Sequence, residues 1–125
     1  LRAIELGVYQ EDKPALFLYK DYYMQHLTNL FTQKESPDTF CHPKMKMLFA
    51  YDKEHDTDLA RSLYMYLVNE RNYSATADAL FIHRNTLIYR IKRINQMISV
   101  DYNDYHERQY LILSYKLNCA QMDFR

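Results

Sequence analysis

The sequence predicts a mainly α-helical fold, a helix-turn-helix bundle, with a minor strand possible in its first part. The chain has one glycine and three prolines in 125 residues, and none of them lies between Lys44 and Arg125. Apolar residues recur at helical spacing through that stretch. Hydrophobic residues make up 48% of the chain, enough for a packed core. A long segment without helix breakers favours helices joined by short polar turns.

Residues 1–50 have a mixed pattern. Gly7 suits the C-terminal cap of a short helix. The apolar run at residues 15–19, centred on Phe17, fits a short strand or the start of a helix, because periodicity does not separate the two over so short a run. The next apolar residues have helical spacing: Tyr23, Leu27, Leu30 and Phe31.

A domain boundary is expected near residue 50. The loop signal Ser36-Pro37-Asp38 precedes Pro43, which suits the first turn of a helix. We therefore divide the chain into residues 1–50 and residues 51–125. Leu1 is not a start methionine and the pattern opens in mid-element, so we expect a fragment of a longer protein.

Four helices are predicted in the second part. Thr57 would cap the first, at residues 58–69, and Ser74 would cap a short second helix at residues 75–80. The inward positions of the first helix are Leu59, Leu63, Tyr66 and Leu67.

The third helix, at residues 84–98, follows a tight connection at Phe81–His83. The fourth would be capped by Asn103 and reach about residue 121. At about 100° per residue, the third helix has one narrow core stripe: Leu87, Ile91, Ile94 and Ile98. Its opposite face carries Asn85, Tyr89, Lys92 and Gln96.

This third helix is locally basic in a chain of zero net charge. Residues 79–100 contain no Asp or Glu but four cations, Arg84, Arg90, Lys92 and Arg93. Such a patch is a candidate site for a polyanion. A basic amphipathic helix taken alone is more often a solvated helix of a bundle, and that alternative stays open.

A short helix, a turn of about three residues and a basic helix form a helix-turn-helix arrangement, which places its second helix in the major groove of DNA. Arg84 and Asn85 lie at the helix N-terminus and suit guanine and adenine edges. The remaining polar side chains suit phosphate contacts: Thr86, Tyr89, Arg90, Lys92 and Arg93. His83 has two candidate roles, a DNA contact or a cap of the helix, and its place near the core edge favours the second.

Residues 72–94 resemble the C-terminal helix-turn-helix of the PucR/CdaR transcriptional regulators. The most specific part is Thr76-Ala77 to Leu80, followed by His83-Arg84-Asn85-Thr86 and Tyr89-Arg90. The resemblance spans roughly residues 52–120. Ser99 replaces a glycine that is usual in the family, and a proline common before the last helix is replaced around Tyr105, so the departures from the family pattern fall in the final loop and not in the predicted DNA-binding helix.

The resemblance implies DNA binding and transcriptional control. Residues 1–50 more loosely resemble the tail of the degenerate cyclase-like (GGDEF-like) domain that precedes this module. The resemblance to the PucR/CdaR regulators also implies that any small-molecule effector acts through an upstream region. Regulators of this kind usually dimerise to read paired half-sites, so we expect a homodimer on double-stranded DNA.

Other functions find little support in the sequence. Cys41 and Cys119 are too far apart for a CxxC pair, and no third ligand accompanies Cys41-His42 at zinc spacing. The acids at residues 52–58 lack the central glycine of a calcium loop, which indicates a solvated linker. No catalytic motif or membrane-length apolar run is present. We therefore expect no enzyme, no metal or cofactor, and a cytoplasmic location.

The last predicted helix is apolar on two sides and therefore has two packing partners. One side carries Tyr110, Leu113, Leu117 and Ala120, and the other carries Tyr105, Ile112, Tyr115 and Cys119. This pattern supports the rival hypothesis, a helical protein–protein interaction or dimerisation module that uses its tyrosine-rich faces.

Overall fold

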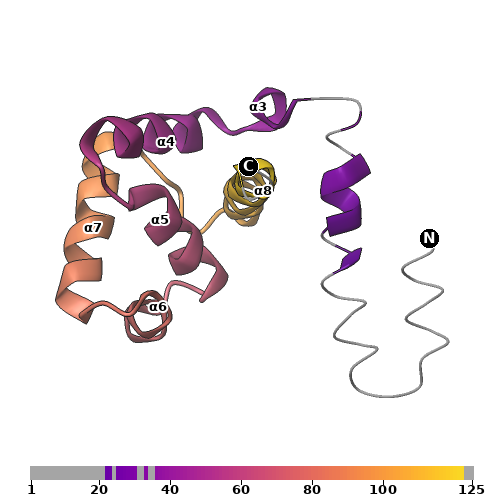
Figure 1. The fold of residues 1–125 in the computed structure, drawn as a ribbon. Coiled ribbons are helices and arrows are strands. Elements are labelled where there is room, and N and C mark those ends of the chain that lie inside the picture. The colour runs from indigo at the N-terminus through magenta and orange to yellow at the C-terminus, as the bar shows by residue number, and fades with distance from the viewer. Residues whose placement is uncertain (1–21, 24, 31–32, 34–35, 123–125) are drawn as a thin grey trace, which may run out of the picture. The chain divides into compact units, whose positions relative to one another are not determined.

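The computed structural model describes the backbone of residues 22–23, 25–30, 33 and 36–122, and the side chains of all of these except residues 37 and 119–122. The described residues contain helices and no strand, which confirms the mainly α-helical prediction. The candidate strand around Phe17 lies outside the described residues. The elements, drawn in Figure 1, are α3 (Pro37–Phe40), α4 (Pro43–His55), α5 (Leu59–Val68), α6 (Tyr73–Leu80), α7 (Arg84–Met97) and α8 (Tyr105–Met122).

The chain divides into two compact units. One consists of Leu1–Phe40 with Ala120–Arg125, and the other of Cys41–Cys119. The described part of the first unit includes α3 and helical residues between 22 and 33. The predicted boundary at residue 50 falls within α4, and the division into domains remains a prediction.

The core of the Cys41–Cys119 unit lies where α5 packs against α4, α6 and α7 (Figure 1). The predicted inward positions of α5 are buried, and so is the predicted stripe of α7. Leu63, Leu87 and Ile94 have no exposed surface. Burial of one such side chain stabilises the fold by roughly 1.5–3 kcal/mol. α7 is therefore held on the bundle by the same residues that define its apolar face.

The corner between α4 and α5 is closed by an aspartate of α4. The Asp52 carboxylate accepts the N–H groups of Leu59 and Ala60, each at 2.8 Å, and the hydroxyl of Thr57 also donates to it. These bonds satisfy two of the unpaired N–H groups at the start of α5. Thr57 as the cap of this helix was a wrong prediction, because its hydroxyl is a donor to Asp52. Asp52 lies within α4, so the prediction that it belongs to a solvated linker was also wrong.

Asn72 caps α6, and the prediction that Ser74 does so was wrong. The Asn72 side chain accepts the N–H of Ala75 at 2.9 Å, and Ser74 is exposed in the first turn. Two left-handed residues, Glu70 at φ 55° and Arg71 at φ 62°, turn the chain between α5 and Asn72. The helix therefore begins two residues earlier than predicted.

The residue that caps α8 also differs from the predicted one. Asp104 accepts the N–H of His106 at 2.9 Å, so the cap is one residue after the predicted Asn103. α8 is buried through Leu111, Ser114 and Leu117, whereas Tyr110 is partly exposed. The two predicted apolar sides of this helix include Leu117 but neither Leu111 nor Ser114, because a polar serine was not expected in the core. Ser114 is accommodated there by the N–H of His42, which donates to its hydroxyl at 2.9 Å.

None of the described helices combines the length and the hydropathy that crossing a membrane requires.

Candidate nucleic-acid interface

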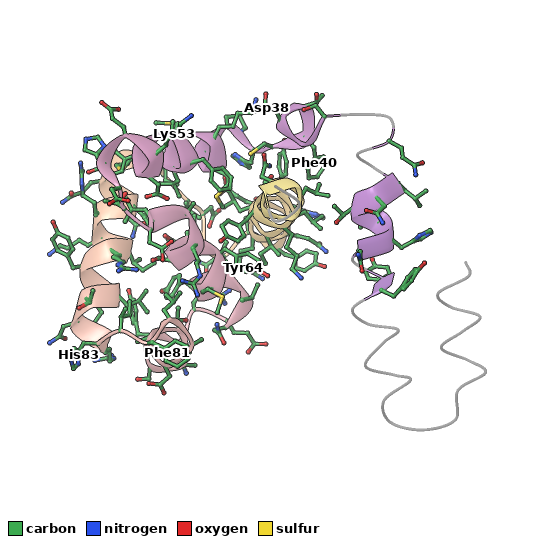
Figure 2. The ribbon with its side chains drawn as sticks, viewed as in Figure 1. Asp38, Phe40, Lys53, Tyr64, Phe81 and His83 are labelled. Carbon is green, nitrogen blue, oxygen red and sulfur yellow. The ribbon has the colours of Figure 1, made fainter. Side chains whose placement is uncertain are left out.

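The turn between α6 and α7 is three residues long and tightly bonded. Phe81 ends α6 in the left-handed conformation, with φ 57° and ψ 43°, and Ile82 donates its N–H to the carbonyl of Ala77 at 3.0 Å. His83 is extended, with φ −69° and ψ 147°, and precedes the first residue of α7. Phe81 and His83 are labelled at this turn in Figure 2. This order of short helix, turn and longer helix is the predicted helix-turn-helix.

Small buried residues let the two helices approach. Thr76 and Ala77 are almost completely buried, and Leu80 is buried beside them. The Thr76 hydroxyl donates to the carbonyl of Asn72 at 2.7 Å, so this buried polar group is satisfied within α6. α7 can therefore cross α6 closely without leaving a polar atom unpaired.

His83 lies at the N-cap position of α7, but its side chain makes no capping hydrogen bond and is exposed. The predicted place near the core edge was wrong, and the side chain does not tie the turn by hydrogen bonds. The N-terminus of α7 therefore presents N–H groups without a side-chain acceptor. Such groups and the helix dipole favour an anion at this end.

The exposed face of α7 carries four side chains that find no polar partner among the residues described. Tyr89 is 69% exposed, and the others are exposed as well. The four are Asn85, Thr86, Tyr89 and Lys92. No acidic residue lies on α7. This face offers an amide, two hydroxyls and an ammonium group to whatever lies against it.

The three arginines of α7 are each held by another helix. The guanidinium of Arg84 lies over the ring of Tyr73, 5.8 Å from its centre. Arg93 lies over the ring of Tyr51 at 5.3 Å and donates to its hydroxyl at 3.4 Å. Arg90 donates to the hydroxyl of Ser62 at 3.0 Å. Cation–π contacts of this kind orient a guanidinium and leave its N–H edge available.

The sequence pattern does not predict these partners of the three arginines. Tyr51, Ser62 and Tyr73 come from α4, α5 and α6, and no local pattern associates them with α7. Only the packing of the three helices brings them to it. Tyr73 is itself held by Tyr66, whose ring centre is 5.1 Å away.

The loop after α7 is tied back to the helix by Tyr102. Its hydroxyl donates to the side-chain oxygen of Asn95 at 2.6 Å. Burial, assisted by the neighbouring Tyr73, raises the pKa of Tyr102 to about 12, so the hydroxyl remains a donor at neutral pH. The C-terminal half of α7 is thus bonded to the loop that follows it.

A cavity of about 630 Å³ lies beside α7, at the corner between α4 and α5. Its lining includes Arg90 and Arg93 but also Asp56 and Asp58. The opposite charges offset one another, so the cavity offers no strong attraction to an anion. Among the residues described, no three His, Cys, Asp or Glu side chains come together in a way that would hold a metal ion.

Residues 59–117 match the family described as the PucR C-terminal helix-turn-helix domain. This part of the chain belongs to that family. The PucR-type domain thus begins with α5 and extends into α8, and it includes the α6–α7 turn and the exposed face of α7.

Relatives with curated names extend the similarity beyond the PucR-type domain. The proline-responsive transcriptional activator PutR of Bacillus subtilis is 35% identical over 94% of this chain and 28% of its own length. The DNA-binding transcriptional activator AdeR of the same organism is 24% identical over 87% of this chain and 26% of its own length. The carbohydrate diacid regulator of Escherichia coli is 37% identical over 48% of this chain and 16% of its own length. The chain thus spans little more than a quarter of PutR and AdeR. No solved structure gives a significant match.

Proposed function

We propose that this chain is the DNA-binding part of a transcriptional regulator and that α7 enters the major groove. The observation that carries the proposal is the acid-free face of α7, where Asn85, Thr86, Tyr89 and Lys92 have no polar partner among the described residues. Because these groups have no polar partner among the described residues, a ligand could bind them without displacing an existing contact. The helix-turn-helix arrangement presents such a face to base edges and phosphates.

The first residues of α7 would specify the sequence. Asn85 can bond adenine through N6 and N7, and Arg84 can bond guanine through O6 and N7. The ring of Tyr73 supports the Arg84 guanidinium from one side, so its N–H edge is directed with little loss of freedom. The open N-terminus of α7, with His83 exposed beside it, would add a phosphate contact.

Other residues of α7 would hold the DNA backbone. Thr86 and Tyr89 can donate hydroxyl hydrogens to phosphate oxygens, and Lys92 and Arg93 supply positive charge. Arg93 keeps part of its guanidinium available, because its bonds to Tyr51 and Gln96 are long, at 3.4 and 3.5 Å. These contacts position the helix and carry no sequence information.

The names of the relatives support regulation of transcription, since PutR, AdeR and the carbohydrate diacid regulator are all named as regulators. We propose a homodimer on paired half-sites about one helical turn apart. The protein would act in the cytoplasm and without catalysis. Residues 1–50 would be the tail of the preceding cyclase-like domain, and an effector would act through an upstream region.

The first test is selection from a random duplex pool at low salt. The parent chain is compared with an Arg84→Ala, Asn85→Ala double variant and with Lys116→Gln, a charge change on α8. We expect the parent and Lys116→Gln to enrich the same repeated motif and the double variant to lose it. Enrichment by the double variant would refute the assignment of the bases to Arg84 and Asn85. If no chain enriches a motif, the protein-interaction hypothesis is favoured.

A further inference from the structure

Arg90 differs from the other cations of α7 because its guanidinium is bonded to a buried hydroxyl of α5 and lies near a carboxylate. Its Nη1 donates to the hydroxyl of Ser62 on α5 and lies 3.7 Å from a carboxylate oxygen of Asp58. The Arg90 side chain is 25% exposed, and Ser62 is completely buried. Lys92, two residues further on, is exposed and unpaired among the residues described. The end of the Arg90 side chain is therefore directed at α5.

The Ser62 hydroxyl, which accepts the bond from Arg90, is oriented by a hydrogen bond of its own. The Ser62 hydroxyl donates its own hydrogen to the carbonyl of Asp58 at 2.6 Å, which leaves its lone pairs for the guanidinium. Asp58 is the residue that precedes α5. The first turn of α5 and the middle of α7 are thus joined through a buried group that water does not reach.

The acids of the α4–α5 corner also act against a phosphate at Arg90. Asp58 lies beside the guanidinium, and Asp56 lines the same cavity. A phosphate approaching Arg90 would meet both carboxylates, whereas Lys92 is exposed and does not line this cavity. Charge therefore distinguishes the position of Arg90 from that of Lys92.

We infer that Arg90 is a positioning residue that sets the orientation of α7 on α5, and not a phosphate contact. The inference rests on the proposed DNA binding. Arg90 lies six residues from Arg84, which is ~9 Å along a helix. A tilt of about 10° at Arg90 would displace Arg84 by ~1.6 Å, which is enough to lose the geometry of a bidentate base contact. Arg90 would thereby affect sequence discrimination without touching DNA.

The test compares Arg90→Met, Ser62→Ala and their double variant with Lys92→Met, which removes the same charge from the exposed face. Affinity is measured for the duplex that the parent enriches and for a random-sequence duplex of equal length, each over a range of salt. Chemical unfolding without DNA is measured for all variants.

We expect Arg90→Met and Ser62→Ala each to lower the ratio of specific to random affinity by about tenfold, the effect of losing one hydrogen bond to a charged group. Their salt slopes should equal that of the parent, and the double variant should be no worse than Arg90→Met. Lys92→Met should weaken both duplexes alike and reduce the slope by about 0.9. A merely stabilising Arg90 would leave the affinity ratio unchanged at temperatures where every variant is folded.

Besides an unchanged affinity ratio, two further results would overturn the inference. One is a slope reduced in Arg90→Met as in Lys92→Met while Ser62→Ala keeps its discrimination, which would make Arg90 a phosphate contact. The other is strict additivity of the Arg90 and Ser62 variants in unfolding, which would show no coupling between them. Failure of the DNA-binding proposal looks different: the parent enriches no duplex, although the unfolding measurements still report the coupling.

Discussion

The carboxylate of Glu107 on α8 lies 2.5 Å from the ammonium nitrogen of Lys44 on α4. Glu107 also accepts the N–H of Asp101 at 2.7 Å, and its side chain is 14% exposed. One carboxylate thus joins the first turn of α4, the loop after α7 and the first turn of α8. Its ionisation state therefore matters for the whole unit.

Acid should destabilise the protein in a way that depends on Glu107. Burial tends to raise the pKa of Glu107, but the bonds from Lys44 and Asp101 and the charge of Lys44 outweigh it, and the pKa is lowered. A folded-state pKa below the unfolded value contributes stability above about pH 4.3, which is lost as the pH falls through the lower, folded value. Burial lowers the pKa of His42. The stability that the neutral His42 ring contributes is therefore present above about pH 6.5 and is lost as the pH falls below it.

Glu107→Gln should flatten the lower part of this profile and cost about 1–2 kcal/mol of unfolding free energy at pH 7. Denaturant titrations between pH 3 and pH 7 measure both effects. Asp104→Asn is a control, because it keeps a capping oxygen at the start of the same helix. An acid profile that is equal in Glu107→Gln and the parent would contradict the role of this carboxylate.

Removal of the Asp52 carboxylate should weaken the start of α5. Asp52→Ala loses both N–H acceptors and the bond from Thr57, and we expect a loss of about 1–2 kcal/mol, as for other helix caps. Glu54→Ala, an exposed acid on the same helix, should change stability by less than about 0.5 kcal/mol. Equal thermal midpoints for the two variants would show that the corner does not depend on Asp52.

Phe81 should be replaceable with a gain in stability. It is 93% exposed and has a left-handed backbone, which costs a residue with a Cβ about 1 kcal/mol. Phe81→Gly should therefore raise the free energy of unfolding by about 0.5–1 kcal/mol. Phe81→Ala keeps the backbone cost and serves as the control. If alanine stabilises as much as glycine, the backbone conformation is not the cause.

Charge and base contacts on α7 should separate in binding measurements. Lys92→Gln should weaken binding to all duplexes and reduce the salt slope by about 0.9. Asn85→Ala should cost about 1–3 kcal/mol on the enriched duplex alone, with the slope unchanged. Competition with a duplex carrying a changed base at the Asn85 position measures the second effect. Loss of affinity by Asn85→Ala on every sequence would instead indicate a general contact.

Helix identities and the α7 stripe were predictable because they rest on local periodicity. Leu87, Ile91 and Ile94 repeat at helical spacing, and their burial follows from it. Helix starts were less predictable, because several polar residues precede each helix. Asn72 and Ser74 are both good capping residues, and only the left-handed turn at Glu70 and Arg71 selects the first.

Tertiary pairings were not predictable from the sequence. Asp52 caps a helix that begins seven residues later, and Arg90 bonds a serine 28 residues earlier. The face that α8 buries depends on Ser114, whose hydroxyl is satisfied by His42 at a distance of 72 residues. Each pairing forms only when the helices have packed, and local patterns in a single sequence do not predict contacts between residues so far apart.

The position of Asp52 also decides how the PucR-type domain can be excised. A polypeptide cut at residue 59, where the family match begins, would keep every residue of α5, α6 and α7. It would lose the acceptor for the first N–H groups of α5, the ring beneath Arg93 and the amide that satisfies Ser114. The smallest piece that folds with α7 correctly held should therefore begin near Cys41, about one helix before the boundary that sequence similarity marks.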